Sequence, residues 1–168
     1  MKPDIREYRD ADYDACRALW VELTQHHRDI YDDQSIGGDD PGASIDEHLA
    51  SPKRRATWVA ERDGVVLGFC SLNAEYDAGE IDPVVVAKAQ RSQGVGTALL
   101  ETAIAEARSR GMRNVSIQPV ARNADAMRLY RRLGFQILGH IDMTMDLAHR
   151  SGGYWKPGVT LHDEEYVY

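Results

Sequence analysis

Hydrophobic residues follow two different spacings along this chain, and the clearest example of each lies near its centre. Residues 81–86 include three consecutive valines, and β-branched side chains of this kind are typical of a buried strand. Between residues 99 and 107 the apolar side chains recur three and four positions apart, which predicts a helix that ends at Gly111. A short segment with two glycines joins them, so the centre of the chain is predicted to be strand, glycine turn and helix.

The same spacings divide the N-terminal half into one strand, two helices and a hairpin. Residues 5–8 predict a strand, and a helix with one apolar face follows it and fades near His26. The residues after this helix are polar and acidic, apart from a short helix at 45–50. Residues 57–72 then predict a β-hairpin, because an Asp-Gly dipeptide separates two apolar runs.

The C-terminal half is predicted to add three strands and one helix. Residues 114–118 alternate as a strand, and a helix that carries Tyr130 follows. Residues 135–147 are apolar at every second position without an interrupting turn, which predicts one long strand, and residues 159–168 can return as a last antiparallel strand. The whole chain, residues 1–168, is therefore predicted to be one α/β domain with a mixed sheet of about seven strands and about four helices on its two faces.

Composition limits the function classes that remain. The 168 residues suffice for one buried core, and no apolar run approaches the ~18 residues that a membrane helix needs. The start of the chain lacks the features of a secretory signal, so we expect a cytoplasmic protein without a membrane partner. Cys16 and Cys70 are predicted to be packed reduced thiols. The net charge of -7 argues against nucleic acid as a partner and suits a cationic one, although acidic surfaces also serve solubility.

The glycine turn predicts an anion site. Gly94 and Gly96 stand where a helix begins, and there the backbone can approach a ligand closely while free N–H groups and the helix dipole attract phosphate. Arg91 adds a cation. A dinucleotide fingerprint would need a third glycine where Leu99 stands, and no Gly-Lys-Ser/Thr follows as in a nucleotide P-loop.

Two motifs in this order resemble the GCN5-related N-acetyltransferase (GNAT) superfamily. Arg-x-x-Gly-x-Gly at residues 91–96 directly follows the valine-rich strand, and Asn, a helix with Tyr, and Gly-Phe follow at residues 123–135. The resemblance implies the GNAT fold, whose mixed and mostly antiparallel sheet is splayed in the middle, and acetyl-CoA as cosubstrate, with its pantetheine arm in the gap. It implies contacts from Val84, Val85, Val86, Arg91, Ser92, Gln93, Gly94, Val95, Gly96, Thr97, Asn123 and Tyr130. Many members have further basic or glycine residues where Ser92 and Gln93 stand, which would weaken phosphate binding here.

Acetyl transfer to an amine needs a base for the ammonium and a proton for the leaving thiolate. Glu80 resembles, by position, the catalytic glutamate of some family members, and Asp82 is the second choice; a solvated acid at a strand end is the alternative for both. Tyr130 is the acid that the resemblance implies, and packing in a helix stripe with Met127 and Leu133 is the alternative. Asn123 is also expected to cap its helix.

The sequence says less about the acceptor. We expect direct transfer to a primary amine of a small molecule or protein, because no side chain is implied as a covalent nucleophile. Acidic residues between 29 and 40, with Tyr154 and Trp155, can form a vestibule for an ammonium group, and a surface that serves solubility is the alternative. The pair His26-His27 matches no metal-ligand spacing and is interpreted as part of a solvated loop, so no metal is expected. The edge at residues 166–168 could pair in a homodimer. The rival function is a non-catalytic acyl-CoA sensor on the same fold.

Overall fold

A computed structural model describes residues 2–147 and 154–168, and its elements follow the predicted order as far as the fourth helix. The strands of the main sheet are β1 (Asp4–Glu7), β2 (Arg54–Arg62), β3 (Val65–Glu75), β4 (Ala78–Val86) and β5 (Asn114–Ser116). The helices are α1 (Tyr13–Tyr31), α2 (Ser44–Ala50), α3 (Val95–Ser109) and α4 (Ala124–Arg132), with the short 3₁₀ turns η1 (Asp10–Asp12) and η2 (Lys88–Gln90). β6 (Pro157–Leu161) and β7 (Glu164–Val167) form a separate hairpin.

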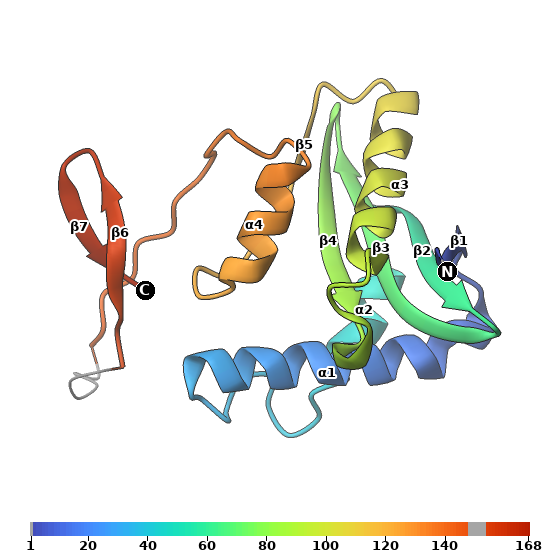
Figure 1. Cartoon of the computed structure of the whole chain (residues 1–168), viewed down its shortest axis with the longest axis horizontal. Coiled ribbons are helices and arrows are strands. Elements are labelled where there is room, and N and C mark those ends of the chain that lie inside the picture. The colour runs from blue at the N-terminus through green and yellow to red at the C-terminus, as the bar shows by residue number, and fades with distance from the viewer. Residues whose placement is uncertain (1, 148–153) are drawn as a thin grey trace.

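The main sheet has helices on both faces (Figure 1). Its strand order is β1-β2-β3-β4-β5, with β1 to β4 antiparallel and β5 parallel to β4. The predicted fold class, a mixed and mainly antiparallel sheet with helices, is therefore confirmed. The strands are divided into a sheet of five and a sheet of two, where one sheet of about seven was predicted. None of the helices in the described part of the chain is long and apolar enough to cross a membrane.

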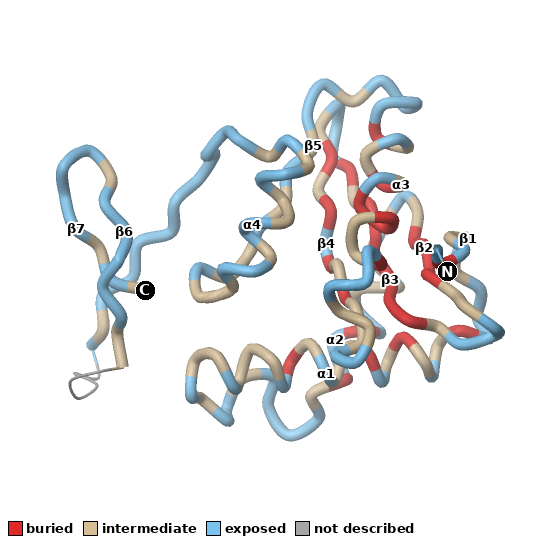
Figure 2. Tube along the Cα trace, in the orientation of Figure 1, coloured by how far each residue is buried: buried red, intermediate tan, exposed pale blue. Residues whose placement is uncertain are grey.

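The core consists of two layers, one on each face of the sheet. On β2 the side chains of Trp58 and Ala60 pack towards α3, whereas Val59 between them packs towards α1 and α2. This alternation follows from the two-residue period of a strand. Figure 2 shows the buried residues concentrated in β2 to β4 and the helices against them. Among the described residues, none after Ala107 is buried.

A bulge in β4 and the short length of β5 open one edge of the sheet. Cys70 pairs with Val84 and Leu72 with Ile81, so β4 has one more residue than β3 between these two pairs. The parallel pairing of β4 with β5 covers only Ala78 to Glu80. As predicted, the two strands then separate, and the second half of β4 has no partner on this side among the described residues.

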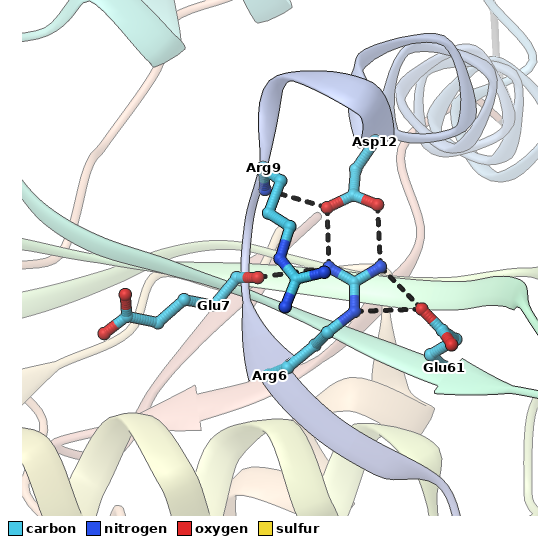
Figure 3. A network of polar contacts seen from close by, with 5 residues as sticks. All are labelled: Arg6, Glu7, Arg9, Asp12 and Glu61. Atoms are coloured by element: carbon cyan, nitrogen blue, oxygen red, sulfur yellow. Dashed lines mark hydrogen bonds and ion pairs between the residues drawn. The ribbon is translucent and has the colours of Figure 1, made fainter.

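An ion-pair network fixes the start of α1 to the sheet (Figure 3). The Arg6 guanidinium donates two hydrogen bonds of 2.8 Å to the carboxylate of Asp12 and bonds of 2.9 and 2.5 Å to Glu61. The Asp12 carboxylate also accepts the backbone N–H of Arg9 at 2.8 Å. These hydrogen bonds, that of Arg6 above all, lower the pKa of Asp12 although its burial opposes them. One guanidinium therefore joins β1, η1 and β2.

Three sequence predictions about elements are wrong. α1 does not fade near His26 but continues to Tyr31, so His26 and His27 lie on a helix and not in a solvated loop. Residues 135–147 do not form a strand and belong to neither sheet; we call them the arm. The last segment contains two short strands instead of one, with a turn at His162 and Asp163 between them.

Candidate active site

A cavity of about 500 Å³ lies where β4, the start of α3, α4 and α1 meet. Ten residues of the predicted coenzyme contacts line it, and six further residues complete it. The predicted residues are Val84, Val85, Val86, Arg91, Ser92, Gly94, Gly96, Thr97, Asn123 and Tyr130. The others are Leu23, His26, Asp125, Ala126, Leu129 and Arg132.

The open edge of β4 forms one wall of this cavity. Val84, Val85 and Val86 pair with β3 on one side only. Backbone N–H and C=O groups on the other side are free to bind an extended ligand, since unpaired polar groups in a cleft need a partner. The Val86 carbonyl accepts a hydrogen bond of 3.2 Å from Nε of Arg91, which holds the arginine at the mouth of the cavity.

The start of α3 forms the anion-binding end. Gly94 is the N-cap residue, with φ of +82° in the left-handed region, and α3 begins at Val95. The N–H groups of the first turn have no partner within a helix, and the positive end of the dipole lies there. A Cβ atom at Gly96 would be 3.4 Å from Leu129 and 3.5 Å from Val86, so the absence of a side chain at Gly96 leaves space in the cavity beside these two residues. With Arg91 beside it, this end can bind phosphate groups.

The remaining two predicted contacts lie outside the cavity. Gln93 belongs to a shallow depression beside it, shared with Gly94 and Thr97. The Val95 side chain is buried in the core at 1% exposure, so only its backbone can contribute to the anion-binding end.

Tyr130 reaches the cavity from α4. Burial, together with the charge of Asp82, raises the pKa of Tyr130 to about 12. Its ring packs against Phe135, with 6.1 Å between the centroids. Asn123 caps the same helix, as predicted: its side-chain oxygen accepts the N–H of Ala126 at 3.2 Å. The tyrosine is therefore both a packed residue and a protonated group at the cavity wall.

The two candidate bases lie further along β4 and do not line the cavity. Glu80 pairs with Asn73 on β3 and with Ser116 on β5, where the two parallel strands still touch. Asp82 follows on the bulge and is open to solvent. The protein around it removes part of its hydration and, with the charge of Glu80, raises the pKa of the Asp82 carboxyl.

His26 is the most informative of the residues that sequence reasoning missed. Burial first and the charge of Arg91 second lower its pKa, which places a neutral imidazole near the anion-binding end. The overlooked signal is the spacing of Leu23, His27 and Ile30, which continues the apolar face of α1 past the residue where the helix was predicted to fade.

The aromatic residues expected to bind a substrate ammonium group, Tyr154 and Trp155, lie against the guanidinium of Arg122. The guanidinium carbon of Arg122 lies 4.7 Å from the ring centre of Tyr31, 5.1 Å from that of Tyr154 and 5.9 Å from that of Trp155. Arg122 also donates hydrogen bonds to the carbonyls of Ile30 and Tyr154. The vestibule residues therefore attach the C-terminal segment to the end of α1 through Arg122.

Among the described residues there is no group of three or more His, Cys, Asp or Glu side chains that could hold a metal ion. Three of the acidic residues near α1, Asp29, Asp33 and Asp40, have protein partners. Asp40, for example, accepts two hydrogen bonds of 2.7 Å from Arg17.

Comparison with known proteins identifies the family to which this fold belongs. Residues 13–135 match the family model described as the acetyltransferase (GNAT) family. The probable N-acetyltransferase camello of Xenopus tropicalis is 32% identical over 109 residues, which cover 63% of this chain and 49% of that protein. The chain spans about half or less of the length of the curated relatives it matches.

Two solved structures illustrate the shared fold. The ribosomal-protein-alanine N-acetyltransferase of Brucella melitensis has a TM-score of 0.63 and 26% identity, covering 81% of this chain and 86% of that one. The aminoglycoside N-acetyltransferase AAC(6')-Iy, crystallised with CoA, also has a TM-score of 0.63, at 18% identity, and covers 85% of this chain and 98% of that one.

Proposed function

The chain belongs to the acetyltransferase (GNAT) family, and on that premise we propose that it transfers the acetyl group of acetyl-CoA directly to a primary amine of a cationic acceptor. One observation carries the proposal: the open edge of β4, the start of α3 and Tyr130 line one cavity of about 500 Å³. Each of the three suits a different part of a thioester of CoA.

The proposed coenzyme position follows from the polarity of the cavity. The pyrophosphate binds the N–H groups at the start of α3 beside Arg91. The pantetheine arm, which has amide groups, extends along the open edge of β4 as an added strand. The N–H of Val84 is the proposed donor to the thioester oxygen, where negative charge develops during attack by the amine. A protein of similar fold, AAC(6')-Iy, was crystallised with CoA, which supports this choice of coenzyme.

Tyr130 is proposed to act on the leaving sulfur. With its pKa raised to about 12, the phenol stays protonated at every pH at which the protein would work. It can donate a hydrogen bond to the thiolate as the carbon–sulfur bond breaks. The acetyl carbon thereby gains the amine nitrogen, and the sulfur leaves as CoA thiolate, which takes its proton in the same step or afterwards from solvent.

Glu80 remains the proposed base, and Asp82 is its alternative. A carboxylate with an ordinary pKa of about 4 accepts a proton poorly from an ammonium near 10.4, so the transfer needs a water relay or a raised carboxyl pKa. The raised pKa of Asp82 and the effect of its charge on Tyr130 support it as this alternative. Measurement of kcat/KM against pH for Glu80→Gln and Asp82→Asn separates them: the variant of the true base loses the rise with pH.

The acceptor is proposed to be cationic because the chain carries a net charge of -7. Such a field raises the local concentration of positively charged substrates. The names of two proteins of similar fold mention an aminoglycoside and a ribosomal-protein alanine as acceptors, one a small molecule and the other a protein amine. A panel with both kinds of amine, assayed by release of CoA thiol, is therefore the appropriate screen.

The first test is calorimetric titration with acetyl-CoA, and the chain offers a matched control. Gly94 and Gly64 both have positive φ, +82° and +77°, and neither would bring a Cβ within 4 Å of another group. Gly94→Asp and Gly64→Asp therefore carry the same charge and similar strain, but only the first is in the cavity. We expect Gly94→Asp to lose binding and Gly64→Asp to retain it.

Two results would count against the proposal. Equal binding by both aspartate variants would place the coenzyme elsewhere. Tight binding of acetyl-CoA by the wild type without thiol release from any amine in the panel would favour the acyl-CoA sensor over the enzyme.

A further inference from the structure

Arg122 lies in the loop between β5 and α4, and its guanidinium contacts two other parts of the chain. It donates a hydrogen bond of 3.3 Å to the Ile30 carbonyl near the end of α1, and another to the Tyr154 carbonyl in the C-terminal segment. The ring centres of Tyr31, Tyr154 and Trp155 are 4.7, 5.1 and 5.9 Å from its central carbon. Three segments that are far apart in the sequence therefore meet at one side chain, and we call this contact the Arg122 tie.

The Arg122 tie is built to hold a cation. Aromatic faces and carbonyl oxygens both attract a guanidinium, and all the residues of the tie are half-buried. Among residues 2–147 and 154–168, no carboxylate forms an ion pair with Arg122. Its Nε is buried and has no hydrogen-bond partner in the same part of the chain. The guanidinium has thus left water without a counter-ion, so the rings and the two carbonyls are what hold it in place.

The tie lies at the edge of the cavity and joins two of its walls. Asn123, the residue after Arg122, lines the cavity and caps α4. His26 lines it from α1 and precedes Ile30 by about one helical turn. Between the described residues, the bond from Arg122 to the Ile30 carbonyl is the one hydrogen bond that connects α1 with α4 or with the loop before it. The separation of these two walls therefore depends on this side chain.

We propose that Arg122 is a positioning residue for the coenzyme: it holds the start of α4 and the C-terminal segment against α1, and so keeps the cavity at the width that acetyl-CoA needs. The inference rests on the proposed function, since it concerns the same cavity. α4 has no fully buried residue, so packing alone determines its position weakly. A cavity that is formed for only part of the time binds its ligand more weakly by that fraction. Coenzyme binding and the attachment of the C-terminal segment are therefore coupled, and each strengthens the other.

The first test is calorimetric titration of Arg122→Met, Arg122→Lys and Arg131→Met with acetyl-CoA. Arg131, on α4, is exposed and does not line the cavity, and no ion pair between described residues involves it. Both methionine variants lose one positive charge, so Arg131→Met controls for the general attraction of the anionic coenzyme. Lysine keeps the charge of Arg122 but lacks the planar fork that reaches two carbonyls. We expect both Arg122 variants to bind roughly tenfold or more weakly, and Arg131→Met to bind within about twofold of the wild type.

Trp155 reports on the tie without any coenzyme. It is one of three tryptophans, and its fluorescence can be quenched by acrylamide once its ring is released from Arg122. Quenching should increase in Arg122→Met and stay unchanged in Arg131→Met, and the increase should vanish when Trp155 is replaced by phenylalanine. Because coupling is reciprocal, acetyl-CoA should lower the quenching of Trp155 in the wild type. A cooperative thermal transition shows that each variant is folded.

Three results would overturn the inference. Normal binding of acetyl-CoA by Arg122→Met, with Trp155 accessible to acrylamide, would show that the tie can be lost without effect on the cavity. Normal binding by Arg122→Lys beside weak binding by Arg122→Met would show that the charge matters and the position does not. Unchanged quenching in Arg122→Met would show that Arg122 does not hold the C-terminal segment. Failure of the wild type to bind acetyl-CoA would instead refute the proposed function, so the two failures are distinguishable.

Discussion

Replacement of Tyr130 by phenylalanine tests how the leaving thiolate is stabilised. The change removes one hydroxyl and keeps the ring that packs against Phe135, 6.1 Å away between centroids. The pKa of about 12 sets the size of the expected effect. A thiol has an ordinary pKa of about 8.5, so full proton transfer from this phenol to the thiolate is uphill. Burial therefore makes Tyr130 a hydrogen-bond donor rather than a strong acid.

A hydrogen bond to a charged group contributes about 1.5–3 kcal/mol, which predicts a 10- to 150-fold loss of kcat in Tyr130→Phe. Full acid catalysis would allow losses of up to about 10⁴-fold. The assay is thiol release at saturating acetyl-CoA from about pH 6 to 10. Because the phenol stays protonated over this range, the wild type and the variant should have profiles of the same shape and different height. A wild-type rate that falls above about pH 9, with no fall in the variant, would show that Tyr130 titrates and would refute this reasoning, as would a loss below about threefold.

Three further outcomes are expected. Gly94→Ala should lower the free energy of unfolding by about 1–2 kcal/mol, because the residue at this position has a φ of +82°. A Cβ at Gly96 would make only ordinary contacts, at 3.4 and 3.5 Å, so Gly96→Ala should melt within about 2 °C of the wild type. It should nevertheless bind acetyl-CoA more weakly in calorimetry. Arg6→Met should cost about 2–3 kcal/mol in denaturant unfolding, because the Asp12 side chain is only 8% exposed and loses its cation. Arg6 lowers the Asp12 pKa, so this difference should be full above pH 3.8 and shrink as pH falls further and Asp12 is protonated. Acetyl-CoA should bind more tightly as pH falls below 6.5, because the lowered pKa of His26 places its protonation there and a protonated His26 attracts phosphate. His26→Gln should abolish that trend in calorimetry.

The central strand, turn and helix could be predicted because local chemistry determines them. Three valines suit a buried strand, and a glycine is needed at position 94 because the backbone there has a positive φ. The end of α1 could not be predicted in the same way. The helix stops at Asp32, which takes the left-handed conformation with φ of 52° that a glycine usually supplies. Neither glycine nor proline marks that point, so the polar residues before it were assigned to a loop.

The arm shows a different limit of sequence reasoning. Alternation at every second position predicts which side of an extended segment needs a core, and it carries no information about which chain supplies that core. Ile137 and Met143 satisfy the pattern of a strand and are nevertheless 95% and 77% exposed. The bulge in β4 could not be predicted from the sequence either, because one extra residue changes the pairing register of two strands without changing their composition.

The bulge and the early end of β5 together explain why the cavity lies beside Val84–Val86. β5 pairs with β4 only as far as Glu80, and the extra residue follows directly, before the strand returns to its register with β3 at Val84. The edge of β4 is therefore open where its side chains are still held by the core, so the backbone presented to a ligand is rigid. Val85 is 2% exposed, and its side chain packs on the face of the sheet that α1 covers. Main-chain groups are therefore the main surface that this strand offers to a ligand. Binding along this wall should consequently depend on the strand conformation more than on the identity of the side chains, whereas the anion-binding end depends on Gly94 and Arg91 themselves.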